Sequence, residues 1–307
     1  MNASIVVCTS NRAESLRGTL IALAKQKYDI GRLEIVVIDN DSTDHTAELV
    51  QHLKSSLSYP IRYALEEKKG IARARNRALQ EASEEIVIFI DDDAIPVSHR
   101  WAEALASSFN HPAVHVAGGD LVPSWPDNTK PKWIHDFFLA PLGLTQFGFH
   151  EKTLQRFPDF PWAANIAYRK STALKYGGFL EELGWNESGR MIPGEECELN
   201  LRIEKNGGQI FYVPDASVRH KISSRKLSAS WLMKRGNSQG ITDAVMARLH
   251  FKEKIPMKAL KKMAAVPVHY LIHLFFLILN NKKQALFHKY NSIHASAFLV
   301  EIFRNND

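Results

Sequence analysis

The sequence predicts an α/β fold, with a mostly parallel central sheet flanked by helices and a helical C-terminal extension. Short apolar runs rich in β-branched residues alternate with helical patterns over about the first 110 residues. Strands that alternate with helices pair in parallel, because each helix carries the chain back across the sheet. After residue 228 the pattern is helical to the end of the chain. We find no internal repeat and no low-complexity tract.

The expected elements follow from these patterns in order. Short apolar runs predict buried strands at 4–9, 34–39, 61–65 and 86–91. Helical spacing of apolar residues predicts helices at 13–25, 42–53 and 70–82, the second of them opening with the hydroxyl of Ser42 as a cap. Residues 118–183 are rich in Pro, Trp and Gly, which predicts long functional loops with one strand at 163–168. A helix is expected from residue 194 to the glycine pair 207–208, followed by a strand at 209–213.

Composition sets limits on the class of protein. The chain has 307 residues, of which 45% are hydrophobic, and this is ample for a large core. Two cysteines, Cys8 and Cys197, are too few for a disulfide framework and lack metal-site spacing, so we expect a reducing, cytoplasmic setting. The N-terminus has no basic segment followed by a long apolar one, and a secretory signal is therefore not expected.

Positive charge is concentrated in the C-terminal part of the chain. Residues 219–307 hold 16 Lys and Arg against 4 Asp and Glu, a net charge of +12 within a chain of net charge +6. This segregation predicts a basic appendage that meets an anionic partner, and the alternative is a solvated, lysine-rich helical surface.

The segment 256–280 combines apolar residues with flanking lysine pairs. Its uninterrupted apolar part is shorter than the roughly 20 residues that a membrane-spanning helix needs. We therefore expect it to lie in the interface of an anionic membrane, and we expect no contact with nucleic acid. The alternatives are a helical hairpin packed on the rest of the protein or a dimer contact.

Polar residues follow three of the predicted strands, in positions that a parallel sheet brings to one edge. They are Thr9 to Arg12, Asp39 to Ser42, and Asp91 to Asp93. Asp91 and Asp93 would point the same way, roughly 6.5–7 Å apart. Clustered carboxylates repel unless they are protonated or bridged by a cation, and hard oxygen ligands suit Mg²⁺ or Mn²⁺. The alternative is a solvated turn whose aspartates cap the next helix.

Four motifs taken together resemble glycosyltransferase family 2, a family of inverting enzymes with a GT-A fold that use nucleotide-diphosphate sugars. The motifs are SIVVCTSNRAESL, EIVVIDNDSTDHT, KKGIARARNRAL and IFIDDDAIP, and the resemblance covers residues 3–235. It implies that Asp91 and Asp93 are the metal carboxylates of a DXD motif, which hold Mg²⁺ or Mn²⁺ with the diphosphate. Asp39 resembles a uracil-binding position, which implies a UDP-sugar donor, although Asp39 and Asp41 would also suit helix capping.

The resemblance implies a set of nucleotide-binding residues, namely Thr9, Arg12, Asp39, Asp41, Gly70, Arg73, Asn76, Asp91 and Asp92. Either Arg73 or Arg75 would balance the diphosphate charge, and the alternative is an ordinary amphipathic helix. His220 matches a position near the leaving-group phosphate or the metal. Trp162, Asn165 and Trp185 match positions that shape an acceptor pocket.

The segment PGEECELNLR, residues 193–202, resembles the family's ED motif. The family's catalytic base then falls on Glu196, where Asp is more usual, and this departure keeps Glu195 open as the base. Glu198 and Arg202 are spaced for an i,i+4 ion pair. The alternative is an acidic first turn favoured by the helix dipole.

These inferences predict an inverting transfer of one sugar from a UDP-sugar to a cell-envelope or lipid-linked glycan. Residues 1–225 would form the catalytic domain, with a nucleotide-binding half at 1–118 and an acceptor-binding half at 119–225. Residues 226–307 would form the basic helical extension, which places the protein in the cytoplasm, peripheral on the inner face of the cell membrane. A nucleotidyltransferase, a glycoside hydrolase and a non-catalytic sugar-nucleotide-binding subunit remain alternatives, although CTSNRAESL lacks a Gly-rich phosphate loop.

Overall fold

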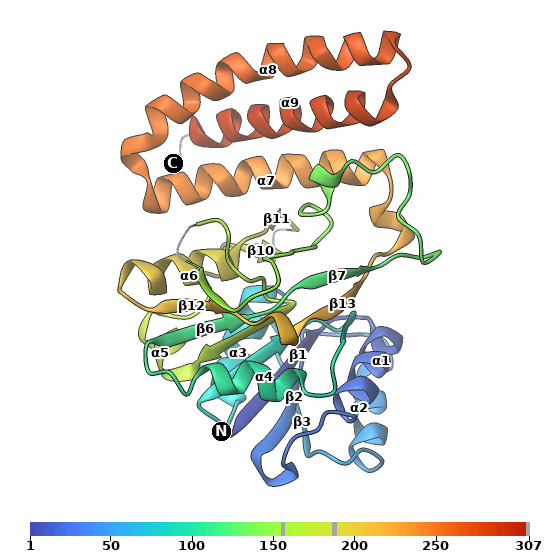
Figure 1. Ribbon diagram of the computed structural model, residues 1–307, viewed down its shortest axis with the longest axis vertical. Coiled ribbons are helices and arrows are strands. Elements are labelled where there is room, and N and C mark those ends of the chain that lie inside the picture. The colour runs from blue at the N-terminus through green and yellow to red at the C-terminus, as the bar shows by residue number, and fades with distance from the viewer. Residues whose placement is uncertain (155–156, 186–188, 305–307) are drawn as a thin grey trace. The chain divides into compact units, whose positions relative to one another are not determined.

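A computed structural model describes residues 1–154, 157–185 and 189–304 (Figure 1). The chain forms two compact units. The sheet unit comprises Met1–Pro123, Thr145–Arg190 and Gly194–Lys221. The helical unit comprises Ser124–Leu144, Met191–Pro193 and Ile222–Asp307.

The sheet unit is built on a mixed sheet with the strand order β3-β2-β1-β4-β9-β6-β12-β8. The four predicted N-terminal strands are confirmed as β1 (Ala3–Thr9), β2 (Leu33–Asp39), β3 (Ile61–Leu65) and β4 (Ile86–Ile90), and all four run parallel. The other strands are β6 (Val114–Gly118), β8 (Lys152–Leu154), β9 (Asn165–Arg169) and β12 (Gln209–Tyr212). Strand β9 runs antiparallel to its neighbours β4 and β6, and β8 runs antiparallel to β12, whereas β6 and β12 pair in parallel. The sheet is therefore mixed, and the expected mostly parallel arrangement is confirmed for all of its strands except β9 and β8.

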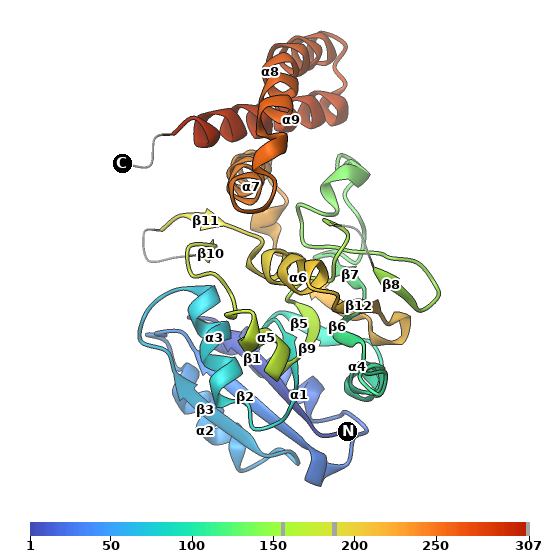
Figure 2. The same ribbon diagram turned by 90° about the vertical axis from the view of Figure 1, so that its left-hand side faces the viewer.

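Helices cover both faces of this sheet (Figure 2). One face packs against α1 (Ala13–Leu23), α2 (Thr46–Lys54) and α4 (Trp101–Ser108). The other packs against α3 (Ile71–Glu81), α5 (Lys170–Lys175) and α6 (Glu195–Lys205). Alternate residues of a strand point to opposite faces, so strands covered on both sides must be apolar throughout, as the runs in β1, β2 and β4 are.

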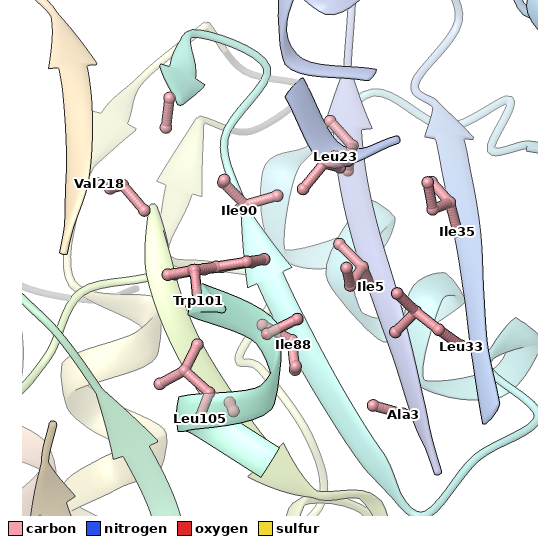
Figure 3. Close-up of a cluster of buried hydrophobic side chains, with 14 of the residues drawn as sticks. Ala3, Ile5, Leu23, Leu33, Ile35, Ile88, Ile90, Trp101, Leu105 and Val218 are labelled. Atoms are coloured by element: carbon pink, nitrogen blue, oxygen red, sulfur yellow. The ribbon is translucent and has the colours of Figure 1, made fainter. Parts of the chain in front are cut away.

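The core on the first face gathers Ile5, Ile88 and Ile90 from the strands around Trp101 and Leu105 of α4 (Figure 3). Each such side chain, when fully buried, contributes about 1.5–3 kcal/mol to folding. On the other face the rings of Phe89, Tyr168 and Phe179 meet edge to face, with centroids 5.6–6.0 Å apart.

Several short elements escape the sequence patterns. Residues 118–183, expected to be loops with one strand, contain two further strands and the short helix α5; the strands are β7 (Leu121–Ser124) and β8. Strand β7 joins β5 (Ala94–Pro96) and β13 (Val218–Lys221) in a small second sheet. Two-residue strands occur as β10 (Gly184–Trp185) and β11 (Met191–Ile192). Elements of two to six residues are too short to show a periodicity, which is why the patterns do not reveal them.

The expected hydroxyl cap at Ser42 is not formed. Helix α2 begins at Thr46, and the Ser42 hydroxyl oxygen instead accepts a hydrogen bond from the Asn11 N–H at 2.8 Å. The Asp44 carboxylate accepts hydrogen bonds from the N–H groups of Ala13 (3.0 Å) and Thr46 (3.1 Å). One side chain therefore satisfies free N–H groups at the start of both α1 and α2.

The helical unit contains α7 (Ala229–His250), α8 (Ile255–Ile278) and α9 (Lys282–Ile302), which confirms the helical C-terminal pattern. Helix α9 packs against both α7 and α8. The contact with α7 is close because Gly240 lies against the carbonyl group of His294, where a Cβ atom would overlap the oxygen. Residues 124–144 join this unit through Phe138 and Leu142, which pack with Leu232 and Tyr290.

Within the described residues, one helical stretch, Lys252–Ile278, is long and apolar enough to cross a membrane, judged by length and composition alone. It includes α8. A single stretch of this kind is weak evidence of a spanning helix, since other helices pass the same test.

Gly119 tests how tightly the end of β6 packs. A Cβ atom there would overlap the carbonyl group of Ala216, so Gly119→Ala should lower the free energy of unfolding by about 2–3 kcal/mol. Gly18 is the matched control, because it lies inside α1 with no atom near its Cβ position. Gly18→Ala should raise stability by up to about 1 kcal/mol in the same chemical denaturation experiment. Equal effects of the two substitutions would contradict this packing.

Candidate functional site

Three aspartates, Asp91 to Asp93, follow β4 at the edge where the parallel strands end, and we call them the aspartate triplet. Thr9 ends β1 and pairs in register with Asp39, which ends β2. The hydroxyl of Thr9 donates a hydrogen bond to Asp92 Oδ2 at 2.7 Å, which joins the end of β1 to the triplet. The structure thus brings together the polar strand ends that the sequence predicted at one edge.

Arg12 is the main counter-charge of the triplet. Its two terminal nitrogens lie 2.8 Å from Asp92 Oδ1 and 2.6 Å from Asp93 Oδ2. The guanidinium fork suits this geometry, since its donors diverge in one plane. Asp92 and Asp93 are buried, whereas Asp91 is more accessible, with 38% of its side chain exposed.

A group of three side chains has the arrangement of a metal site. One ligand atom from each of Asp91, Asp93 and His220 can be chosen so that all three lie within 4.8 Å of one another. His220 comes from β13, which pairs with β5, and its Nε2 lies 3.3 Å from Asp93 Oδ1. Asp93 Oδ1 is buried and receives no hydrogen bond of normal geometry from any described residue. Two carboxylates and one imidazole suit Mg²⁺ or Mn²⁺, so these residues fit a divalent cation.

The carboxyl groups of the triplet differ in acidity. Burial raises the pKa of Asp92 to about 7, in spite of the opposing charge of Arg12. Burial also acts to raise the pKa of Asp93, but the contact with His220 and the charge of Arg12 outweigh it and hold that pKa below its ordinary value. At neutral pH a partly protonated Asp92 therefore lies beside an ionised Asp93, which reduces the repulsion within the triplet.

Asp39 lies buried at the end of β2, which pairs with β1. Its Oδ1 accepts a hydrogen bond from the Ser42 N–H (3.0 Å), and its Oδ2 accepts one from the Tyr63 hydroxyl (2.8 Å). Burial and the hydrogen bond to Asp39 raise the pKa of Tyr63 to about 12, so Tyr63 remains a donor. The neighbouring Asn40 accepts a hydrogen bond from the Gly70 N–H at 2.8 Å, which fixes the start of α3 beside β2.

Three other predicted nucleotide-binding residues have contacts of their own. Asp41 lies 3.5 Å from Lys69 Nζ, and Arg73 forms an ion pair with Glu181 at 3.0 Å. Both polar atoms of the Asn76 amide are bonded to the backbone of Phe179, each at 2.8 Å. Their roles in nucleotide binding stay predictions.

Arg75 is the arginine of α3 that reaches the triplet. It is buried, forms an ion pair with Glu195, and lies 3.7 Å from Asp91 Oδ1. The sequence left Arg73 and Arg75 as alternatives for balancing the diphosphate charge, and that role stays a prediction for both. Their positions differ, because Arg75 lies on the buried face of α3 with Ala72, Ala78 and Leu79.

The two candidate base residues begin α6 and have different surroundings. Both oxygens of the buried Glu195 are engaged, one by Arg75 and the other by the Gly194 N–H at 3.0 Å. Burial and the neighbouring charge of Glu195 raise the pKa of Glu196 to about 7. The predicted ion pair of Glu198 and Arg202 is confirmed, at 2.6 Å.

The predicted acceptor residues are placed differently from one another. The Asn165 amide is buried; it accepts a hydrogen bond from Trp101 Nε1 (2.8 Å) and donates to the carbonyl groups of Asp120 and Ala216. Trp162 is partly buried against the core of the first sheet face. Trp185 is 54% exposed, and the preceding Gly184 lies against the Glu195 carboxyl group. Their contact with an acceptor stays a prediction.

Comparison with known proteins agrees with this fold. The model of the family "Glycosyl transferase family 2" matches residues 4–173. A glucosyl-dolichyl phosphate glucuronosyltransferase of Haloferax volcanii is 28% identical over 254 residues, which cover 81% of this chain and 79% of that protein. The succinoglycan biosynthesis protein ExoM of Rhizobium meliloti is 26% identical over 244 residues, covering 79% of this chain and 74% of that protein.

Solved structures share the fold at low sequence identity. A mannosyltransferase from Pyrobaculum calidifontis, solved with GDP-Man and Mn²⁺, has a TM-score of 0.66 at 18% identity, and the match covers 98% of this chain and 87% of that one. TarS 1–349 of S. aureus, solved with UDP, has a TM-score of 0.55 at 17% identity, covering 96% and 91% of the two chains.

The fold of the chain is the GT-A fold of these transferases. The family match covers more than half of the chain, so the protein belongs to glycosyltransferase family 2 and is a glycosyltransferase. This decides against a nucleotidyltransferase, a glycoside hydrolase and a non-catalytic subunit. Its acidic cluster is able to hold a metal ion.

Metal binding at Asp91, Asp93 and His220 should stabilise the protein. A ligand that binds only the folded state at about 100 times its dissociation constant adds about 2.7 kcal/mol, so Mn²⁺ should raise the unfolding temperature of the wild type. Asp93→Ala and His220→Ala should lose this Mn²⁺-dependent shift in a thermal scan. Glu103→Ala, which changes an acid on α4 that is paired with Arg100, is the control and should keep it. A full shift in Asp93→Ala would remove Asp93 from the metal site.

Proposed function

We propose that this protein is an inverting glycosyltransferase that moves one sugar from a UDP-sugar to a cell-envelope or lipid-linked glycan. The observation that carries the proposal is the position of Arg75, which forms an ion pair with Glu195 and lies 3.7 Å from Asp91. One buried side chain thus connects the candidate metal carboxylates with the pair of glutamates that contains the candidate base. A donor held at the first group would therefore lie beside the second.

The roles predicted for the three parts of the chain are compatible with this arrangement. Residues 1–118 supply the nucleotide-binding groups, residues 119–225 supply the base and the acceptor groups, and residues 226–307 form a basic extension. Trp185 is suited to the acceptor side, because it is exposed and follows Gly184, which lies against the Glu195 carboxyl group. An exposed aromatic face is a favourable surface for a sugar ring.

Glu196 is the better candidate for the general base. The pairing of Glu195 with Arg75 and with the Gly194 N–H lowers the availability of its oxygens for a proton. Glu196 has a pKa of about 7, raised by burial and by the charge of Glu195, which suits a group that must take up a proton near neutral pH.

The reaction is a single displacement. Glu196 takes the proton of the acceptor hydroxyl group, and the acceptor oxygen forms a bond to the anomeric carbon of the donor sugar. The bond from that carbon to the diphosphate oxygen breaks on the opposite side, and UDP leaves with the electron pair, which inverts the anomeric configuration. Mg²⁺ or Mn²⁺ at Asp91, Asp93 and His220 would supply positive charge to stabilise the departing diphosphate. The ion pair with Arg75 holds the Glu195 carboxyl group in place beside Glu196.

Uracil recognition by Asp39 supports the choice of a UDP-sugar. A carboxylate accepts a hydrogen bond from the imide N–H of uracil, and the Tyr63 hydroxyl and the Ser42 N–H hold the Asp39 carboxylate in place. The complex of TarS with UDP supports the same base, whereas the mannosyltransferase was solved with GDP-Man.

The similar proteins support an envelope or lipid-linked acceptor. The name of the Haloferax volcanii enzyme specifies glucosyl-dolichyl phosphate, a lipid-linked sugar, and that of ExoM specifies succinoglycan biosynthesis. The basic, apolar C-terminal segment supports action in the cytoplasm at the inner face of the cell membrane.

Replacing the base should remove turnover and leave donor binding. Glu196→Gln should lower kcat by at least about 10²-fold, the usual contribution of a positioned base, with little change in UDP affinity. In the wild type kcat should rise about tenfold per pH unit below the Glu196 pKa of about 7 and level off above it, because only ionised Glu196 accepts a proton. The measurement is kcat between pH 5.5 and 8.5.

Two further variants control this experiment. Glu204→Gln changes an acid further along α6 and should leave the pH profile unchanged. Glu195→Gln should keep a rise of kcat with pH even if its turnover falls, with the midpoint moved to lower pH, because the charge that raises the Glu196 pKa is removed. Wild-type turnover in Glu196→Gln, or loss of the pH dependence only in Glu195→Gln, would assign the base to Glu195.

Donor choice is tested by release of the nucleotide diphosphate from a panel of UDP- and GDP-sugars, with and without Mn²⁺. UDP-sugars should be turned over in a metal-dependent manner. Asp39→Ala should weaken UDP binding by about 10-fold or more, since a hydrogen bond to a charged group contributes about 1.5–3 kcal/mol. Tyr63→Phe keeps the carboxylate and should have a smaller effect. A preference for GDP-sugars would overturn the assignment of uracil to Asp39.

A further inference from the structure

Helix α8 has both of its histidines and Lys262 on the face that packs against α9. His269 Nδ1 lies 2.8 Å from His288 Nδ1 of α9, and His273 Nδ1 lies 2.8 Å from the Ala285 carbonyl oxygen. Lys262 Nζ lies 2.9 Å from His294 Nδ1. A surface helix in water normally turns its apolar side chains toward the protein and its polar ones outward. The polarity of α8 is the reverse of this.

The outward face of α8 is apolar along most of its length. Leu271 is 64% exposed, Phe275 55% and Ile278 83%. The other large exposed apolar side chains on this face or just beyond it are Met257, Leu260, Met263, Val268, Tyr270, Leu274, Leu277 and Leu279. Residues 263–281 include no Asp, Glu, Lys or Arg. A continuous apolar face of this kind marks a site for a partner or a membrane.

Lysines stand at both ends of this face. Lys252, Lys254 and Lys261 are exposed before it, and Lys282 and Lys289 are exposed after it. The only acids between residues 252 and 304 are Glu253 and Glu301 in the sequence, and Glu301 is buried. An apolar surface bordered by cations is complementary to anionic lipid head groups above an acyl-chain layer.

We infer that α8 is the membrane-docking element of this protein and lies in the plane of an anionic bilayer with its outward face in the acyl region. The inference rests on the proposed use of an acceptor at the membrane, and it names the helix and the face that make the contact. The lysines would reach back to the head groups while their stems cover apolar surface.

Lying in the interface fits this helix better than crossing the membrane. A spanning helix must be apolar all round, whereas the inner face of α8 carries Lys262, His269 and His273. Helix α9, which packs along that face, contains Lys283, Lys289 and Asn291 and would be drawn into the hydrocarbon layer with it. In-plane docking leaves these groups on the aqueous side.

A second copy of the chain is a less favourable occupant of the same face. Two α8 faces pressed together would bring the exposed lysines at the helix ends toward one another, with the single exposed acid Glu253 too few to offset them. An anionic bilayer offsets the same charges. The lysines therefore favour lipid over a dimer.

The test is sedimentation of the full-length protein with vesicles of phosphatidylcholine, alone or with about one-third phosphatidylglycerol. Wild-type protein should bind the anionic vesicles, and raised salt should weaken the binding. The double variant Leu271→Glu/Phe275→Glu should bind at least about tenfold more weakly, because two charges would enter the acyl region. Val300→Glu is the matched control: Val300 is 72% exposed on α9, outside the proposed face, and this variant should bind like the wild type.

Equal vesicle binding by the double variant and the wild type would overturn the inference, as would a wild-type dimer in light scattering that the double variant dissociates. Unfolding temperature verifies that each variant is folded. Mn²⁺-dependent binding of UDP, measured on the same samples without lipid, separates the two proposals. Retained UDP binding with lost vesicle binding supports the docking face, and absent UDP binding in the wild type counts against the proposed function alone.

Discussion

The balance of charge after β4 is the constraint on which the rest of the sheet unit depends. Three successive carboxyl groups would repel one another, and leaving even one of them buried and unpaired costs several kcal/mol. The groups that relieve this repulsion are Arg12 before α1, Arg75 in α3 and His220 in β13. The start of α1, the rotation of α3 and the pairing of β13 with β5 are thus all fixed by one cluster of acids.

Arg75 also gives Glu195 and Glu196 different surroundings. Glu195 is paired with Arg75, whereas desolvation and the charge of Glu195 raise the pKa of the partly buried Glu196 to about 7. A buried ion pair is poor evidence for stability, since the cost of removing both charges from water offsets much of their attraction. Its value here lies in orientation: the pair engages Arg75, and among the described residues no other side chain forms a hydrogen bond or ion pair with the neighbouring Glu196 carboxyl group, which suits its proposed role as the base.

The parts of the fold that local pattern determines could be predicted from the sequence. The four parallel strands and the acids at their ends follow from apolar runs and from the rule that such strands end at one edge. The strand at β9 was expected from its residues, but its antiparallel direction could not be predicted in this way, because Asn165 at its start bonds to groups at residues 101, 120 and 216. Contacts so distant in sequence leave no local signal. The sequence alone could have shown that Arg75 lies on the buried face of α3 and Arg73 does not, since helical spacing separates them.

Helix α8 shows why an apolar segment cannot be interpreted from composition alone. Its residues fit both a packed hairpin and a membrane contact, and the structure uses one face for packing on α9 and leaves the other exposed. Exposing that face to water lowers the stability of the helical unit, whereas a bilayer removes the penalty. A transferase and a lipid-linked acceptor bound to one membrane also have a raised effective concentration, because both are confined to that surface instead of being spread through the whole solution. The proposed use of a membrane-bound acceptor would therefore account for the exposed apolar face of α8.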